Sequence, residues 1–202
     1  MARSVIAVMI SLVISACVVA CVMAMPYPAD KSNYSYPFSF VSRAAWGARD
    51  PTSTSLLQTP VSLVIIHHSY IPTDCYTQES CKQSMRAMQN AHQLVNGWID
   101  IGYNFAVGGE GSVYEGRGWN RVGAHAAGYN TQSIGIVMIG DFVSKLPTPS
   151  QLQSVKQLIS AGVQLGYISP EYRLIGHRQV TATECPGQEF FNELTTWDHF
   201  EP

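Results

Sequence analysis

Two histidines and one cysteine are the residues of this sequence with the clearest potential for chemistry. His67 stands near the end of a strongly apolar segment, His177 ends a shorter one, and Cys185 follows eight residues after His177. Imidazole and thiolate are preferred zinc ligands, and three protein ligands leave the fourth tetrahedral position for water. A metal held in this way lowers the pKa of its bound water to roughly 7, which gives a hydroxide nucleophile. An attacked carbonyl then needs a hydrogen-bond donor for its developing oxyanion.

The spacing of these residues leaves other interpretations open. His67 and His177 are 110 residues apart, so spacing alone is a weak signal. Two core histidines with satisfied hydrogen bonds and a buried thiol would give the same pattern. A cysteine–histidine pair that acts without metal, with the thiolate as nucleophile, is a further alternative.

The sequence contains five cysteines, an odd number. Cys17 and Cys21 lie in the apolar N-terminal segment. Cys75 and Cys81 are close enough to form a disulfide across a polar loop in an oxidising compartment. Closing so short a loop gives modest stabilisation, so we expect this bond to fix the start of the next helix. Cys185 remains as an odd thiol: a buried inert cysteine, a partner in an intermolecular disulfide, or a functional residue.

The N-terminal segment has the features of a secretory signal peptide. A single arginine precedes a long apolar run, and Val22 and Ala24 place small residues at positions −3 and −1 of a cleavage site. We therefore expect residues 1–24 to be removed and the protein to be secreted. An uncleaved membrane anchor is the alternative, because the run approaches the roughly 20 residues that span a bilayer. Residues 25–40 are expected to form a loose arm, with a glycosylation sequon at Asn33.

The composition is that of a folded domain. Of the 202 residues, 46% are hydrophobic and 13% are charged, and the net charge is −2. Average proteins carry roughly 25% charged residues, so this surface is polar without being heavily ionised. A nucleic-acid-binding protein would show a basic face, and a disordered chain would combine low hydrophobicity with high net charge. We expect neither, and predict one domain over residues 41–202.

Apolar patterning predicts strands that alternate irregularly with helices. Continuous β-rich runs indicate buried strands, and a glycine-rich turn between two shorter runs indicates a hairpin. Irregular alternation is typical of a mixed sheet with helices on its faces. The predicted strands cover residues 61–66, 103–107, 113–114, 134–139 and 174–175.

Three helices are expected. In the first, over residues 81–95, Met85, Met88, His92 and Val95 recur at helical spacing and predict a buried face. The second has the strongest start signal, because Thr148 can cap it, Pro149 suits its first position and Gln151 completes a capping box. Gly166 is a natural stop for this helix, and a last helix is predicted over residues 189–196.

Six short motifs occur in order along the chain. They are VIIHHS at 64–69, DIGYNF at 100–105, YEGRGW at 114–119, GAH at 123–125, GYN at 128–130 and GHRQVTATECPG at 176–187. In this order and spacing they closely resemble the animal peptidoglycan recognition proteins, which are related to a zinc amidase of a bacteriophage. The resemblance covers roughly residues 40–202. It implies a single α/β domain with a central mixed β-sheet, three main helices, and a substrate groove with a zinc site on one face.

The resemblance also implies roles for five residues. His67, His177 and Cys185 match the zinc ligands. Tyr103 matches the tyrosine that hydrogen-bonds the scissile carbonyl or the metal-bound water, and Thr183 lies where catalytic members usually carry threonine. Members that bind peptidoglycan without cutting it typically lose the cysteine or the first histidine. This chain keeps both, which favours an active amidase.

Further residues are expected to bind substrate. Positions equivalent to His68, His92, His125 and Asn130 line the muropeptide groove in the family. On sequence alone, His92 is also explained as a buried core histidine, His125 as a structural residue and Asn130 as a turn residue. Members that prefer diaminopimelate-type peptidoglycan tend to carry Gly-Trp, as at Gly97 and Trp98, together with an arginine, as at Arg117. A guanidinium suits the additional carboxylate of diaminopimelate, because it forms paired, charge-assisted hydrogen bonds.

The resulting expectation is a secreted zinc N-acetylmuramoyl-L-alanine amidase of innate immunity. It would hydrolyse the amide between the lactyl group of N-acetylmuramic acid and the L-alanine of the stem peptide. Its partners would be bacterial peptidoglycan and muropeptides, with no nucleic acid and no stable membrane insertion after signal cleavage, and it would be a monomer. The alternative is a non-catalytic peptidoglycan receptor that activates immune signalling.

Overall fold

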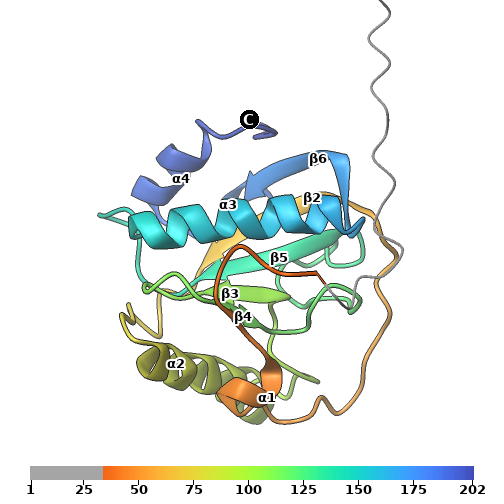
Figure 1. Cartoon of the computed structure of the whole chain (residues 1–202), viewed down its shortest axis with the longest axis vertical. Helices are drawn as coiled ribbons and strands as arrows, with labels where there is room; N and C mark the ends of the chain where they lie inside the picture. The colour runs from red at the N-terminus through yellow and green to blue at the C-terminus, as the bar shows by residue number, and fades with distance from the viewer. Residues whose placement is uncertain (1–33) are drawn as a thin grey trace, which may run out of the picture.

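The computed structural model describes residues 34–202 and is built on one six-stranded mixed β-sheet (Figure 1). The leader predicted for residues 1–24, the sequon at Asn33 and the first part of the arm lie outside these residues. The strands are β1 (Phe40–Val41), β2 (Val61–His68), β3 (Phe105–Val107), β4 (Val113–Glu115), β5 (Ser133–Met138) and β6 (Ile168–Gly176). Their order across the sheet is β1-β4-β3-β5-β2-β6. Only β3 and β4 pair antiparallel, as the predicted hairpin; the other pairs are parallel.

Helices cover both faces of the sheet, as Figure 1 shows. On one side lie α3 (Pro149–Gln164) and α4 (Gln188–Leu194), and on the other lie α1 (Arg43–Trp46) and α2 (Gln78–Asn90). The three longer helices, α2, α3 and α4, are those expected from the sequence. Among residues 34–202, no helix is both long and apolar enough to cross a membrane.

Alternation along β2 decides where its functional residues point. Val64 and Ile66 pack in the hydrophobic cluster that also contains residues of α3. Leu63 and Ile65 belong to a separate cluster with Ala126. Because successive side chains of a strand point to opposite faces, His67 shares the face of Leu63 and Ile65, away from α3.

The start of α3 forms as the sequence predicts. The Thr148 hydroxyl accepts a hydrogen bond from the Gln151 backbone N–H at 3.1 Å, and the Gln151 side chain accepts one from the Thr148 N–H. Pro149 occupies the first turn. This capping box satisfies donors that the first turn of a helix leaves free.

The end of the first predicted helix differs from expectation. Residues Ala91–Val95 continue α2 as a π-helix, η1. A π-turn rotates the side chains that follow it relative to an α-helix. Val95, expected on the buried face with Met85 and Met88, is therefore 81% exposed, and His92 is half-buried.

The described part of the arm is not loose. Tyr36 stacks on Phe38 and Phe40, each with ring centroids 4.9 Å apart, and its hydroxyl accepts a hydrogen bond from the Trp119 indole N–H at 3.1 Å. Phe40 begins β1, which pairs with β4. Aromatic packing thus attaches residues 34–40 to the domain, a contribution that their Pro- and Ser-rich composition conceals.

Neither edge strand of the sheet presents a long free backbone edge. β1 is only two residues long. β6 contains Pro170, and part of its outer edge is covered by the C-terminal residues. There the Leu174 N–H donates to the His199 carbonyl at 2.8 Å, and the Leu174 carbonyl accepts from the Glu201 N–H at 3.0 Å.

Candidate active site

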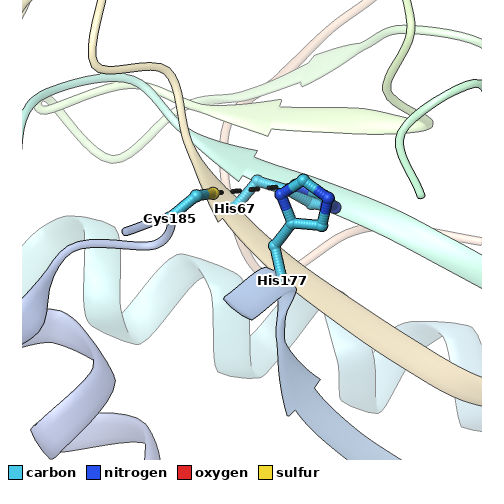
Figure 2. Close-up of side chains that lie close together, drawn as sticks. All are labelled: His67, His177 and Cys185. Carbon is cyan, nitrogen blue, oxygen red and sulfur yellow. Dashed lines mark hydrogen bonds between the residues drawn. The ribbon is translucent and has the colours of Figure 1, made fainter. Parts of the chain in front are cut away.

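His67, His177 and Cys185 come together at the carboxyl ends of β2 and β6 (Figure 2). One ligand atom of each lies within 4.8 Å of the other two. His67 Nδ1 is 3.8 Å from Cys185 Sγ, and the His67 and His177 ring centroids are 4.4 Å apart. Tetrahedral zinc with the usual bond lengths separates nitrogen from sulfur by about 3.5 Å. The donor set and its spacing fit a zinc ion with one open position.

The sheet register explains how residues so distant in sequence meet. β2 and β6 are parallel neighbours, and Ile66 is paired with Gly176. His67, the next residue of β2, and His177, which directly follows the end of β6, therefore emerge side by side. Carboxyl ends of parallel strands are a common place for ligand sites.

Three hydrogen bonds to backbone groups hold Cys185 in place, and one of them comes from β2. The His68 N–H donates to Cys185 Sγ at 3.3 Å, and the Arg178 N–H donates to the Cys185 carbonyl at 2.9 Å. The Thr183 hydroxyl accepts from the Cys185 N–H at 3.2 Å. Thr183 thus lies beside the candidate ligands and shapes the turn that carries Cys185.

Burial controls the protonation of the three groups. It lowers the pKa of His67 well below its ordinary value, and the neighbouring His125 and His177 lower it further. It also lowers the pKa of His177. Burial raises the pKa of the Cys185 thiol to about 12, although the His68 N–H and the charge of Arg178 oppose this. The imidazoles are therefore neutral with lone pairs available, and a bound cation would displace the thiol proton.

A pocket of about 430 Å³ opens in front of these groups. Its lining residues are His68, Ser69, Tyr70, Tyr103, Val143, His177, Thr183, Glu184 and Cys185. The Tyr103 ring lies 5.2 Å from the His67 ring. Burial raises the pKa of Tyr103, and the charge of an ionised Cys185 adds to the shift. The Tyr103 hydroxyl therefore keeps its proton at neutral pH and can donate a hydrogen bond.

His68 belongs to this pocket, but it also has structural partners. Its Nδ1 accepts a hydrogen bond from the Phe142 N–H at 3.3 Å and lies 4.0 Å from an Asp141 carboxylate oxygen. Burial lowers the pKa of His68, and Asp141 opposes the shift. The ring is thus held in place at the pocket wall.

His125 and Asn130, expected to line the groove, lie behind His67 and in the loop that carries His125, respectively. His125 is 8% exposed, and its Nδ1 lies 3.0 Å from His67 Nε2, behind the candidate ligand. The Asn130 side-chain oxygen accepts hydrogen bonds from the His125 and Ala126 backbone N–H groups, both at 2.9 Å. Neither residue lines the described pockets. Sequence reasoning missed this arrangement because it depends on contacts between loops.

His92, Gly97 and Trp98 form a second group of expected binding residues. The His92 and Trp98 rings are stacked, with centroids 4.6 Å apart. His92 Nδ1 accepts a hydrogen bond from the Gly102 N–H at 3.0 Å, and the His92 ring lies 5.7 Å from Tyr103. Gly97 has a positive φ of 70°, which favours glycine and makes the turn that brings Trp98 back over His92.

Arg117 and Trp98 line a neighbouring pocket of about 340 Å³. Arg117 is only 6% exposed. Its Nε donates to the Ile101 carbonyl at 2.6 Å and its Nη1 to the Val122 carbonyl at 2.7 Å. Its Nη2 is buried without a hydrogen-bond partner. Since an unpartnered buried donor is unfavourable, this guanidinium is suited to receive an anionic ligand group.

Tyr70 is a pocket residue that the sequence analysis did not identify. It lines the pocket beside Cys185, is 55% exposed, and has a positive φ of 56°. That conformation is uncommon for a residue other than glycine. Its position directly after the His67-His68-Ser69 segment was the available signal, because loops at strand ends often carry function.

The disulfide expected between Cys75 and Cys81 is present, with Cα atoms 5.1 Å apart. Thr77 lies in the loop that it closes and caps α2, because the Thr77 hydroxyl accepts a hydrogen bond from the Ser80 N–H at 3.2 Å. The bond therefore fixes the start of α2, as predicted.

Comparison with known proteins agrees with this architecture. Residues 57–188 match the sequence family described as N-acetylmuramoyl-L-alanine amidase. The chain is 54% identical over 160 residues to peptidoglycan-recognition protein LB of Drosophila melanogaster, covering 79% of this chain and 69% of the relative. It belongs to the peptidoglycan-recognition proteins of this amidase family.

Other members of the family extend the comparison. The chain is 44% identical over 161 residues to the human N-acetylmuramoyl-L-alanine amidase. This alignment covers 78% of this chain but only 28% of the human protein. The crystal structure of peptidoglycan recognition protein-LE in complex with tracheal cytotoxin, a monomeric diaminopimelic acid-type peptidoglycan, matches with a TM-score of 0.79 and 42% identity. That alignment covers 81% of this chain and 96% of the other.

Proposed function

We propose that this protein is a secreted, zinc-dependent N-acetylmuramoyl-L-alanine amidase that binds and hydrolyses bacterial peptidoglycan. The observation that carries the proposal is the cluster of His67, His177 and Cys185, whose ligand atoms lie within 4.8 Å of one another beside an open pocket. A protein that only binds peptidoglycan has no need of a thiol beside two imidazoles. The family relationship supports the same activity.

The three side chains would hold zinc through His67 Nδ1, one nitrogen of His177 and the Cys185 thiolate. When bound, zinc supplies a Lewis acid and an activated water at neutral pH. The protein contributes the orientation of the ligands, because His67 is fixed by β2 and Cys185 by three backbone hydrogen bonds. The pocket lies beside these ligands, and the scissile amide would lie there.

Tyr103 would act as the hydrogen-bond donor to the scissile carbonyl. Its ring is next to His67, and its raised pKa keeps the hydroxyl protonated. A donor aimed at the carbonyl oxygen stabilises the negative charge that develops there. Thr183 would contribute by holding the Cys185 turn, through the hydrogen bond to the Cys185 N–H.

The test of the amidase is release of stem peptide from peptidoglycan by the zinc-loaded protein. Wild-type protein should cleave, a chelator should abolish cleavage, and added zinc should restore it. Cys185→Ala should lose at least about a hundredfold in kcat/KM, because a three-ligand site loses one ligand. Its muropeptide binding should persist, because Arg117 and Trp98 are unchanged.

A matched control is Ser69→Ala, which alters a pocket residue that is not a candidate ligand. It should retain zinc-dependent cleavage. Binding of muropeptide by wild-type protein, with no cleavage at any zinc concentration, would contradict the amidase and favour the receptor alternative.

We also propose a preference for diaminopimelate-type peptidoglycan. Arg117 lines a pocket shared with Trp98, and its Nη2 has no hydrogen-bond partner among the described residues. A guanidinium at this pocket wall can pair with the carboxylate that lysine lacks. Arg117→Lys should lower affinity for diaminopimelate-type muropeptides by roughly tenfold or more and change lysine-type affinity little. The ratio of the two affinities is the measurement, because any general loosening of the fold would lower both. Equal wild-type affinities would contradict the preference.

Residues 1–24 are proposed to direct secretion. The Cys75–Cys81 disulfide supports this, since such bonds persist in oxidising compartments. N-terminal sequencing of protein recovered from culture medium should begin at Met25. A chain that keeps its leader and fractionates with membranes would instead support the anchor.

A further inference from the structure

His125 is a buried, titratable side chain for which the proposed mechanism has no direct use. It lies on the loop between β4 and β5, with its ring nearly perpendicular to that of His67, at 84° and with centroids 5.0 Å apart. His125 Nδ1 is 3.0 Å from His67 Nε2. The other nitrogen of His67, Nδ1, faces Cys185 Sγ. His125 therefore contacts the side of His67 that is remote from the candidate metal position.

The backbone provides a dedicated space for this ring. A Cβ atom at Gly135, on β5, would lie 2.3 Å from His125 ring atoms, and one at Gly123 would lie 2.5 Å from the ring. Both glycines thus allow the imidazole to rest directly on the main chain. Asn130 fixes the same loop through its two backbone hydrogen bonds. The ring position is determined by the fold on several sides.

A chain of hydrogen bonds runs from His125 into β5. His125 Nε2 is 3.4 Å from the Ser133 hydroxyl, and the Ser133 hydroxyl donates to the Tyr129 carbonyl at 2.7 Å. A carbonyl only accepts, so the single hydroxyl hydrogen of Ser133 points to Tyr129. Ser133 can then only accept from His125, which places the hydrogen of the neutral ring on Nε2.

The hydrogen on His125 Nε2 determines which residue donates in the hydrogen bond between His67 and His125. With its hydrogen on Nε2, His125 has a lone pair at Nδ1 and accepts from His67. His67 must therefore carry its hydrogen on Nε2. That tautomer leaves the lone pair of His67 on Nδ1, the atom that faces Cys185.

We propose that His125 and Ser133 are positioning residues that fix the tautomer and orientation of His67, so that its Nδ1 lone pair is directed to the metal. This inference rests on the proposed zinc site. Hydrogen bonds of this kind to metal-binding histidines typically change metal affinity by roughly 10- to 100-fold. The chain ends on a backbone carbonyl and not on a carboxylate, so it orients His67 without adding negative charge behind it.

The test uses two variants and two measurements. His125→Phe keeps a ring in the space but removes the acceptor, and Ser133→Ala removes the far hydrogen bond. Zinc affinity, measured by competition with a chromophoric chelator, should fall roughly 10- to 100-fold in His125→Phe and by a smaller factor in Ser133→Ala. Ser154→Ala is the matched control, because it also deletes a buried serine hydrogen bond, to the Gly111 carbonyl at 2.6 Å, but far from His67. It should leave zinc affinity unchanged.

The second measurement is the 15N spectrum of the His67 ring in zinc-free protein. Wild type should show one tautomer, with the hydrogen on Nε2, and His125→Phe should show a mixture. Unchanged zinc affinity with a single His67 tautomer in both variants would overturn the proposal. If wild type bound no zinc, the proposed function would fail, whereas the tautomer measurement would still decide whether His125 positions His67. If His125→Phe did not fold, Ser133→Ala would provide both measurements.

Discussion

The unprotonated Nδ1 of His92 helps to hold the backbone at Gly102 in place. Its Nδ1 accepts from the Gly102 N–H, while its ring stacks on Trp98 at the side of the proposed binding pocket. Burial, with the charge of Arg117 adding to it and that of Asp100 opposing it, lowers the pKa of His92 to about 4. Protonation would remove the acceptor that holds the Gly102 backbone.

This pKa predicts a dependence of stability on pH. The folded-state pKa of His92 lies below its ordinary value of about 6.5, so between those values the unfolded chain binds more protons than the native protein. The contribution of His92 to the free energy of unfolding should therefore be complete at neutral pH. It should decrease as the pH drops from about 6.5 toward 4. Urea unfolding across this range measures the slope.

His92→Asn is the variant that isolates this contribution, because its side-chain oxygen can accept from Gly102 but does not titrate. The slope should be smaller in the variant than in wild type. Identical slopes in the two proteins would show that the pKa of His92 does not differ between the folded and unfolded states as expected.

At this scale the sequence identified some side chains better than others. The grouping of His67, His177 and Cys185 could be predicted from the resemblance of their motifs to a known family, whereas their spacing alone is a weak signal. The location of His125 could not, because it depends on Gly123 and Gly135 leaving space in segments that meet only after folding. Local sequence does not report such contacts.

The start of α3 is the element whose sequence signal and structure agree most fully. The Thr148 hydroxyl accepts from the Gln151 N–H and also donates to the Gly109 carbonyl at 2.8 Å. It therefore joins the helix to the turn between β3 and β4. One side chain satisfies a donor of the helix and an acceptor of the hairpin.

Loss of this hydroxyl should be measurable. Thr148→Ala should lower the free energy of unfolding by about 1–2 kcal/mol, because both bonds are lost. Thr148→Ser keeps the hydroxyl and should differ from wild type by a few tenths of that amount. Chemical denaturation of the three proteins makes the comparison. Equal losses in the alanine and serine variants would assign the effect to the methyl group.

Other elements could not be derived from local pattern. The π-helix Ala91–Val95 follows α2, and its sequence contains no proline or glycine that would indicate the change of helix type. β1 forms because Phe40 meets Val113 across the sheet, which no short-range signal reveals. These elements depend on tertiary packing, whereas the long apolar runs of β2 and β5 are recognisable in isolation.

For the whole molecule, the hydrophobic core is independent of the candidate metal site. The large cluster beneath α3 and the one beneath α2 contain none of the three proposed ligands. The fold should therefore persist without metal, unlike that of small zinc-dependent domains. Zinc would act as a ligand of the folded protein.

Thermal unfolding should show that zinc stabilises the folded protein without being required for folding. Free zinc at about 100 times its dissociation constant stabilises a protein by about 2.7 kcal/mol, which for a domain of this size corresponds to a rise in Tm of roughly 5–10 °C. A chelator should reverse the rise without unfolding the protein. Cys185→Ser should show little response to zinc. Loss of the folded state on chelation alone would contradict the separation of core and site.

The edges of the sheet bear on how the protein behaves at high concentration. An unpaired edge strand is a template for a strand of another molecule. Here β1 is too short to serve as one, and β6 combines Pro170, which lacks a backbone donor, with the covering contacts of Leu174 to the C-terminal residues. Strand-to-strand association through this sheet is therefore disfavoured at both ends. A protein that would accumulate outside the cell, without chaperones to disperse aggregates, benefits directly from such protected edges.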